Sequence, residues 1–115
     1  MIKKSGKLRT DIVENLMDGE GSVNITHLLE IEDFHNNGRL YAKLLLKPGM
    51  SIGYHVHNGE QESYYILKGE GLYNDNGKEV VVKNGDFTLC KNGEGHSIKN
   101  IGEEDLEFIG LITNI

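Results

Sequence analysis

Glycine punctuates this chain at short intervals, and that spacing constrains the fold more than any other feature of the sequence. Fifteen glycines occur against a single proline, mostly as isolated residues between short apolar runs. Isolated glycines at this spacing are typical of tight turns between short strands. No long amphipathic helix is evident between the turns. The pattern predicts an all-β chain of about eight short strands, arranged as an antiparallel sandwich or barrel.

Alternation of apolar and polar residues locates individual strands. Residues 39–46 place every second side chain on one apolar face, and residues 23–29 alternate in the same way. His27 falls on the apolar face of its run, where a hydrogen-bonded core histidine is the expected role. Asn76 and Gly77 both tolerate a positive φ, so together they predict a hairpin turn.

The N-terminal part of the chain has no clear alternation, whereas the strand at residues 62–67 is apolar on both faces. A barrel strand needs only one buried face, so Tyr65 and Leu67 require cover from elsewhere. We therefore expect one domain with a barrel over residues 23–115. The N-terminal segment, residues 1–22, is expected to pack on the barrel or on a dimer partner, and we predict a homodimer.

Charge and cysteine content exclude several classes of partner and compartment. The formal net charge is −6 and no basic run occurs, so neither nucleic acid nor an anionic membrane is an expected partner. No segment approaches the roughly 20 apolar residues of a membrane span. Cys90 is the only cysteine, which rules out an internal disulfide and predicts a cytoplasmic protein with a buried core thiol.

The stretch "GYHVHNGEQESYYILKG" concentrates side chains that bind metals. Residues two apart on a strand point to the same side, so His55 and His57 can converge on one ion. After the turn, Glu62 is the first inward residue of the next strand, and His96 opens a later strand. Three imidazoles and one carboxylate suit a divalent transition metal such as Fe, Mn, Ni or Zn, with the identity left open. Two turn residues, Glu60 and Gln61, are rival ligands, but either would break the inward alternation.

These residues also form a recognisable pattern: the chain resembles the cupin superfamily of small β-barrels. The family's first motif is matched by Gly49, His55, His57, Glu62 and Gly69, and its second by Gly85, Gly93, His96 and Asn100. Lys91 stands where the second motif has proline, a departure that removes a turn-stiffening residue and no ligand. The resemblance implies an antiparallel double-stranded β-helix, an RmlC-like jelly-roll barrel, with His55, His57, Glu62 and His96 as the metal ligands.

Cupins include dioxygenases, decarboxylases, lyases, and sugar or sugar-phosphate isomerases and epimerases, so the fold does not choose the reaction. A sugar phosphate requires cations near its phosphate, but strand alternation predicts that Arg39, Lys43 and Lys99 point out of the barrel. We therefore expect a divalent-metal enzyme of dioxygenase or lyase type acting on a small molecule, with Tyr64 as a polar group of the cavity. A non-catalytic ligand-binding module is the first alternative, and a sugar or sugar-phosphate isomerase or epimerase is the second.

Overall fold

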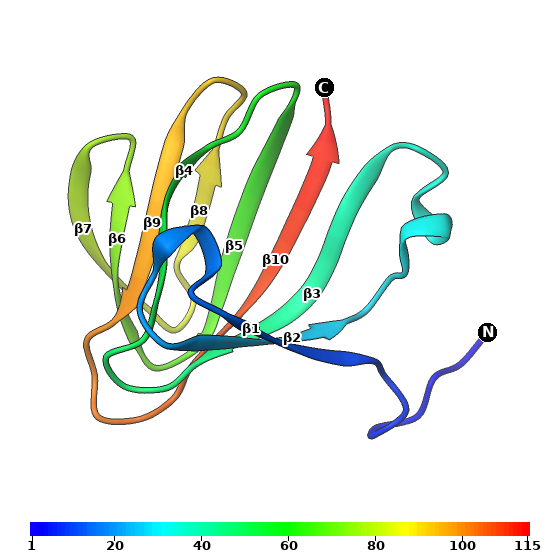
Figure 1. Cartoon of the computed structure of the whole chain (residues 1–115), viewed down its shortest axis with the longest axis horizontal. Helices are drawn as coiled ribbons and strands as arrows, with labels where there is room; N and C mark the ends of the chain where they lie inside the picture. Colours follow the sequence, from blue (N-terminus) through cyan, green and yellow to red (C-terminus); the bar gives the residue numbers. More distant parts are fainter.

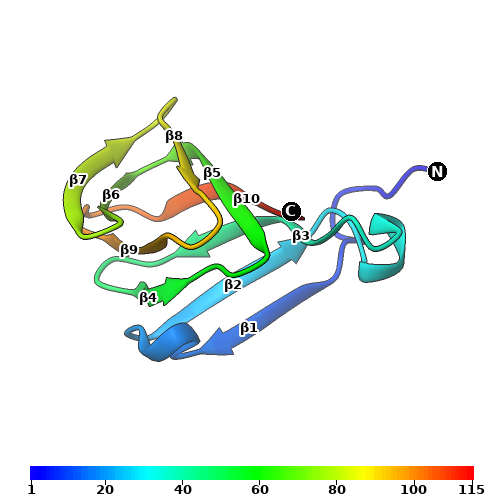
Figure 2. The same ribbon diagram turned by 90° about the horizontal axis from the view of Figure 1, so that it is seen from above.

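Ten strands form two antiparallel sheets that face each other across a shared interior, in a computed structural model that describes residues 1–115 (Figures 1 and 2). One sheet has the strand order β1-β2-β3-β10-β5-β8 and the other β4-β9-β6-β7. The strands are β1 (Thr10–Glu14), β2 (Ser22–His27), β3 (Gly38–Leu46), β4 (Ser51–Val56), β5 (Glu60–Lys68), β6 (Glu70–Asp75), β7 (Lys78–Lys83), β8 (Phe87–Cys90), β9 (Gly95–Asn100) and β10 (Leu106–Asn114). Two short 3-10 helices, η1 (Leu16–Asp18) and η2 (Ile31–Phe34), complete the fold. The prediction of an all-β double-stranded β-helix is confirmed.

The hairpin predicted at Asn76 and Gly77 joins β6 to β7. Both residues have positive φ, 50° and 103°. Turns of this kind match the right-handed twist of the two strands that they connect. The strands accordingly pair in register from the turn outward, beginning with Asp75 opposite Lys78.

The core lies between the two sheets and draws on both of them. Leu44, Ile66 and Phe108 from the larger sheet meet Ile98 from the smaller one, and all four are at most 2% exposed. Burying a side chain of this size stabilises the fold by about 1.5–3 kcal/mol. Cys90 is also buried, and burial raises the pKa of its thiol to about 11, so the prediction of a buried core thiol is confirmed.

Asn100 closes one end of the barrel. It is 1% exposed, and its side-chain amide donates to the carbonyl oxygens of Leu46 and Glu104, both at 2.8 Å. Its side-chain oxygen accepts from the backbone N–H of Gly102 at 2.9 Å. Asn100 therefore fixes the backbone of a turn.

A β-bulge in β3 changes the direction of Arg39. Leu40 pairs with Ile112, whereas Gly38 pairs with Thr113, so Arg39 is an extra residue without a partner on β10. An extra residue of this kind shifts the alternation of the strand locally. The side chains of Arg39 and Leu40 therefore both reach the interior cavity.

A second bulge lies in β4, directly before the His-x-His pair. Ile52 pairs with Ile98 and His55 pairs with His96, so β4 has one more residue than β9 between these pairs. Because of the extra residue, Ile52 and His55 both face inward although they are three positions apart. The bulge thus allows the core residue Ile52 and the first histidine, His55, to lie on the same, interior side of the strand.

The N-terminal segment packs on the barrel of the same chain. Strand β1 pairs with β2 at the edge of the six-stranded sheet, and η1 lies against β4 (Figure 1). It does not cover the outer face of β5, where Tyr65 is 47% and Leu67 is 37% exposed. Neither helical element has the length and hydropathy that a membrane-crossing helix requires.

Candidate metal centre

Four side chains from three parts of the barrel converge on one point. His55 comes from the end of β4, His57 directly follows that strand, Glu62 comes from β5 and His96 from β9, and their ligand atoms all lie within 4.8 Å of one another. The Nε2 atom of His96 is 3.1 Å from that of His55 and 3.2 Å from that of His57. Oε1 of Glu62 is 3.0 Å from Nε2 of His96, 3.1 Å from that of His57 and 3.7 Å from that of His55.

Each ring of the His-x-His pair is oriented by a contact at its other nitrogen. His55 Nδ1 lies 2.8 Å from the carbonyl oxygen of Gly53, and His57 Nδ1 lies 2.5 Å from Oε2 of Glu60. Both acceptors require the proton on Nδ1, which leaves the lone pair of Nε2 free to bind a metal. Arg39 holds the same Glu60 carboxylate with two hydrogen bonds.

The third ring, His96, is fixed by two tyrosines. Tyr73 Oη lies 2.8 Å from His96 Nδ1, and the Tyr64 ring stacks on the imidazole with 4.9 Å between centroids. Tyr64 also packs against Phe108, so it separates the apolar core from the site. Because His96 is fully buried, these contacts leave its ring one orientation.

The electrostatics of the cluster favour an ionised Glu62. Burial raises the pKa of the Glu62 carboxyl, but the close contacts with the three imidazoles outweigh it and hold the pKa well below its usual range. The contact with Glu62 raises the pKa of His57, whereas burial lowers the pKa of His96. A buried carboxylate faced by three Nε2 atoms is a donor set that fits a divalent transition metal.

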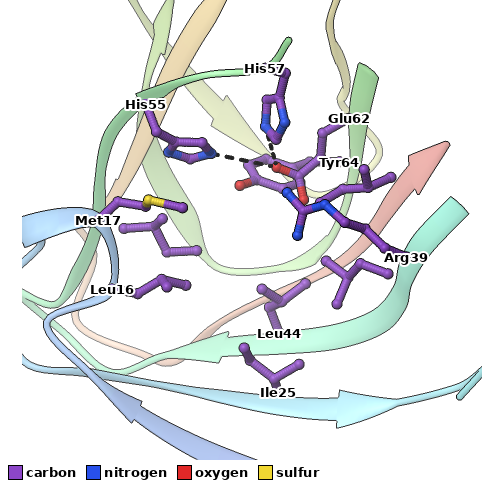
Figure 3. A pocket seen from close by; sticks show the side chains of 12 residues that line it. Leu16, Met17, Ile25, Arg39, Leu44, His55, His57, Glu62 and Tyr64 are labelled. Atoms are coloured by element: carbon purple, nitrogen blue, oxygen red, sulfur yellow. Dashed lines mark hydrogen bonds and ion pairs between the residues drawn. The ribbon is translucent and has the colours of Figure 1, made fainter. Parts of the chain in front are cut away.

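The cluster opens onto a cavity of about 150 Å³ (Figure 3). Eight of its twelve lining residues are hydrophobic, and besides the cluster only Arg39 is charged. The lining residues are Leu16, Met17, Ile25, Arg39, Leu40, Leu44, Ile52, His55, His57, Glu62, Tyr64 and Ile112. The arrangement can therefore present a metal ion and one cation to a small ligand between apolar walls.

The structure differs from the sequence-based expectations at three places. The prediction that Arg39 points out of the barrel is wrong, because the bulge in β3 breaks the alternation from which it was made. Glu60, considered as a rival ligand, instead contacts the far nitrogen of His57. Tyr73 was missed, although its inward position in the alternating run "GLYND" is a usable signal. Tyr64 lies at the cavity, and its catalytic role stays a prediction.

Comparison with known proteins assigns the class. The family model described as "Cupin domain" matches residues 42–112, a span that includes both histidine motifs. The chain belongs to the cupin family.

A similar sequence and a similar crystal structure both come from Thermotoga maritima. One, named "Oxalate-binding protein", is 46% identical over 112 residues, which cover 97% of this chain and 93% of that protein. A crystal structure described as a predicted oxalate decarboxylase is 45% identical and covers 100% of both chains, with a TM-score of 0.95. An RmlC-like cupin from Shewanella frigidimarina is 16% identical with a TM-score of 0.74, covering 98% of this chain and 89% of its own, and supports the fold alone.

Proposed function

We propose that this protein binds oxalate through a divalent metal ion held by His55, His57, Glu62 and His96. The observation that carries the proposal is the position of this four-residue cluster in the wall of a small, largely apolar cavity. The metal, when bound, supplies positive charge and accepts oxygen donors from the ligand. The name of the relative that is 46% identical supports the choice of oxalate among small oxygen-donor anions.

The charge of the cavity supports an anion. A divalent ion held by one carboxylate, Glu62, retains a net positive charge, whereas the charge of Arg39 on the cavity wall is balanced by its ion pair with Glu60. The apolar lining lowers the local dielectric, which strengthens the attraction between the metal charge and an anion. An anionic oxygen donor therefore matches the site better than a neutral molecule.

The volume of the cavity favours small ligands over large ones. Pockets for drug-sized molecules usually measure about 300–1,000 Å³, whereas this cavity measures about 150 Å³. A ligand of a few heavy atoms fits that volume. A sugar phosphate is larger, so this comparison favours a small dicarboxylate over the isomerase alternative.

Calorimetry on protein of known metal content tests the proposal. The bound metal is quantified, removed with a chelator and restored as Mn(II), and each form is titrated with oxalate and with acetate. We expect the metal-loaded protein to bind oxalate more tightly than acetate by about tenfold or more, and the metal-free protein to bind neither. Oxalate binding that is equal with and without metal, or no tighter than acetate binding, refutes the proposal.

A pair of histidine variants provides the control. His57→Ala removes a ligand of the cluster, and we expect it to lose both metal and oxalate. His35→Asn changes a histidine outside the cluster, at a positive φ of 49° that asparagine tolerates. This variant should still bind both the metal and oxalate.

Turnover is the second candidate, in line with the dioxygenase or lyase activity expected from the sequence. Tyr64 supports it, because its side chain lines the cavity. Burial raises the pKa of its phenol well above the usual value, so the O–H group stays protonated and can donate a hydrogen bond to a bound carboxylate. Release of formate and carbon dioxide from oxalate by wild-type protein, and its loss in Tyr64→Phe, would favour a decarboxylase over a binding protein.

We also propose that the outer face of the six-stranded sheet binds a second copy of the chain. Tyr65 lies between Ile109 and Phe87 in the register, and Tyr65 and Phe87 are 47% and 63% exposed. Monomeric proteins rarely expose a contiguous apolar face of this kind, and two identical faces can pair about a two-fold axis.

Sedimentation equilibrium tests the dimer. Tyr65→Lys should convert a dimer to a monomer, whereas Val81→Lys on the four-stranded sheet, at a site 52% exposed, should not. A wild-type protein that is monomeric at high concentration contradicts the proposal.

A further inference from the structure

The N-terminal segment supplies one wall of the metal-site cavity. Leu16 and Met17 from η1 line the cavity together with Ile25 of β2. Met17 is 47% exposed, so its side chain lies between the cavity and solvent. Figure 3 shows its thioether next to His55, on the side of the cavity opposite Arg39. A ligand that approaches the metal cluster from this side must pass the Met17 side chain.

The backbone at this wall has an uncommon conformation. Asn15, Met17 and Asp18 have φ values of 49°, 54° and 62°, in the left-handed region. Asparagine and aspartate occur there with some frequency, but a long apolar side chain such as methionine seldom does. Glycine adopts this conformation without strain. A methionine at this position therefore indicates that its side chain has a use, since residues in such conformations cluster at functional sites.

The strained turn is pressed against the strand that carries the histidines. A Cβ atom on Gly53 would lie 1.8 Å from the carbonyl oxygen of Met17, so the two backbones touch only because residue 53 is glycine. Hydrogen bonds between Glu20 and Ser51, 2.9 Å in each direction, hold the two segments together. The carbonyl of Gly53 also accepts from His55, so the position of Met17 and the orientation of that ring depend on the same residue.

We propose that Met17 sets the upper size limit of the ligand at the metal site. The thioether is long, unbranched and flexible, so it can cover the cavity entrance while a small anion passes. A ligand with additional methylene groups must displace it or collide with it. The strained turn keeps the Met17 backbone close to His55. A movement of the whole segment therefore cannot carry the side chain away from the cavity entrance.

This inference rests on the proposed metal site, and its test uses monocarboxylates so that the choice of oxalate is not assumed. The protein is loaded with cobalt(II), whose visible absorption responds to ligands, and titrated with formate, acetate, propionate and butyrate. For wild-type protein we expect the affinity to fall by about tenfold or more across the series, the order of discrimination that a few methylenes provide in a fitted pocket. For Met17→Ala we expect the affinities to agree within about threefold.

A matched variant and a metal-free measurement complete the test. Ile12→Ala removes a similar apolar side chain from β1 at a site 66% exposed and outside the cavity, and it should keep the size dependence of wild type. Without metal, Met17→Gly should unfold at a higher temperature than Met17→Ala. Both variants lose the thioether, but only glycine escapes the left-handed strain.

Two results overturn the inference. One is the same size dependence in wild type and Met17→Ala, and the other is a wild-type protein that binds no carboxylate of any size. The proposed function fails separately, if the series shows size selection by Met17 but oxalate binds no better than acetate.

Discussion

Arg39 and Glu60 form a two-pronged ion pair directly behind the metal cluster. Arg39 Nε donates to Oε1 of Glu60 at 2.8 Å and Nη2 donates to Oε2 at 2.7 Å, while Oε2 also contacts His57 Nδ1. The Arg39 guanidinium lowers the pKa of Glu60 to about 2, so this carboxylate stays ionised and holds the proton of His57 on Nδ1. A residue at the cavity wall is thereby connected to the orientation of a candidate ligand.

Loss of this pair should weaken metal binding. Arg39→Ala and Glu60→Gln are each expected to reduce metal affinity by about 10- to 100-fold, the effect usual for outer partners of ligating histidines. Arg39→Lys should have a metal affinity close to that of Arg39→Ala, because an ammonium cannot reproduce the two-pronged geometry. Competition with a chromophoric chelator measures the affinity. Lys43→Ala, on the same strand but in an exposed ion pair, is the control, and equal losses in Lys43→Ala and Arg39→Ala would contradict the prediction.

The hydroxyl of Tyr73 should matter to the metal, and that of Tyr64 should not. Tyr73→Phe removes the hydrogen-bond partner of His96 Nδ1 and leaves a buried polar nitrogen unpaired, which costs about 1–3 kcal/mol. We expect lower metal affinity and lower stability in urea unfolding. Tyr64→Phe deletes the same atom but retains the stacking on His96, so metal affinity should stay close to that of wild type. Equal effects from the two substitutions would refute this assignment.

Alanine at position 53 should destabilise the protein. The added Cβ of Gly53→Ala would lie 1.8 Å from a backbone oxygen of η1, so one segment must move. Overpacking of this kind costs about 1–3 kcal/mol. In Gly102→Ala the new atom would meet nothing closer than 3.6 Å, which makes it the matched control. Urea unfolding compares the two, and a Gly53→Ala protein as stable as Gly102→Ala would be inconsistent with the close contact between η1 and β4.

The ion pairs of Asp11 should stabilise the protein at neutral pH and lose that effect in acid. Hydrogen bonds to His27 and Arg9 lower the pKa of Asp11 below its ordinary 3.8 in the folded protein. A lowered folded-state pKa means that the stabilisation is complete above the unfolded-state pKa and is lost as pH falls through the folded-state value. The difference in unfolding free energy between wild type and Asp11→Asn should therefore be largest near neutral pH and shrink below pH 3.8.

Urea unfolding of the metal-free proteins at several pH values measures that difference. Glu79→Gln removes an exposed carboxylate from β7 and is the control. A difference between wild type and Asp11→Asn that grows as the solution becomes more acidic would run against the prediction.

The four cluster residues could be identified from the sequence because their spacing survives local irregularity. His55 and His57 lie beyond the β4 bulge and stay two residues apart, so alternation places both on one side. Glu62 begins a regular stretch of β5, and its register with Cys90 contains no shift. Short-range spacing of this kind is set by strand geometry alone.

The remainder of the site could not be predicted because it depends on contacts between distant segments. The inward turn of Arg39 arises from a mismatch between β3 and β10, which no single strand reveals. The place of Met17 on the cavity wall depends on the packing of η1 against β4. The segment before residue 23 contains one strand of only five residues, β1, and the positive-φ turn that follows it at Asn15, Met17 and Asp18 has no periodic signal in the sequence.

The two bulges make the interior of this barrel tolerant of length changes at two places and intolerant of them elsewhere. Removal of one residue between Ile52 and His55 would leave these two positions two apart on a regular strand, opposite Ile98 and His96, and both would still face inward. Removal of Arg39 would likewise leave Leu40 opposite Ile112 and Gly38 opposite Thr113, but the cavity wall would lose its guanidinium. A deletion of one residue away from the bulges has no such compensation, because it exchanges inside and outside for all positions on one side of it. In a related sequence, the place of a length change along β3 or β4 is therefore more informative than the fact that the length changed.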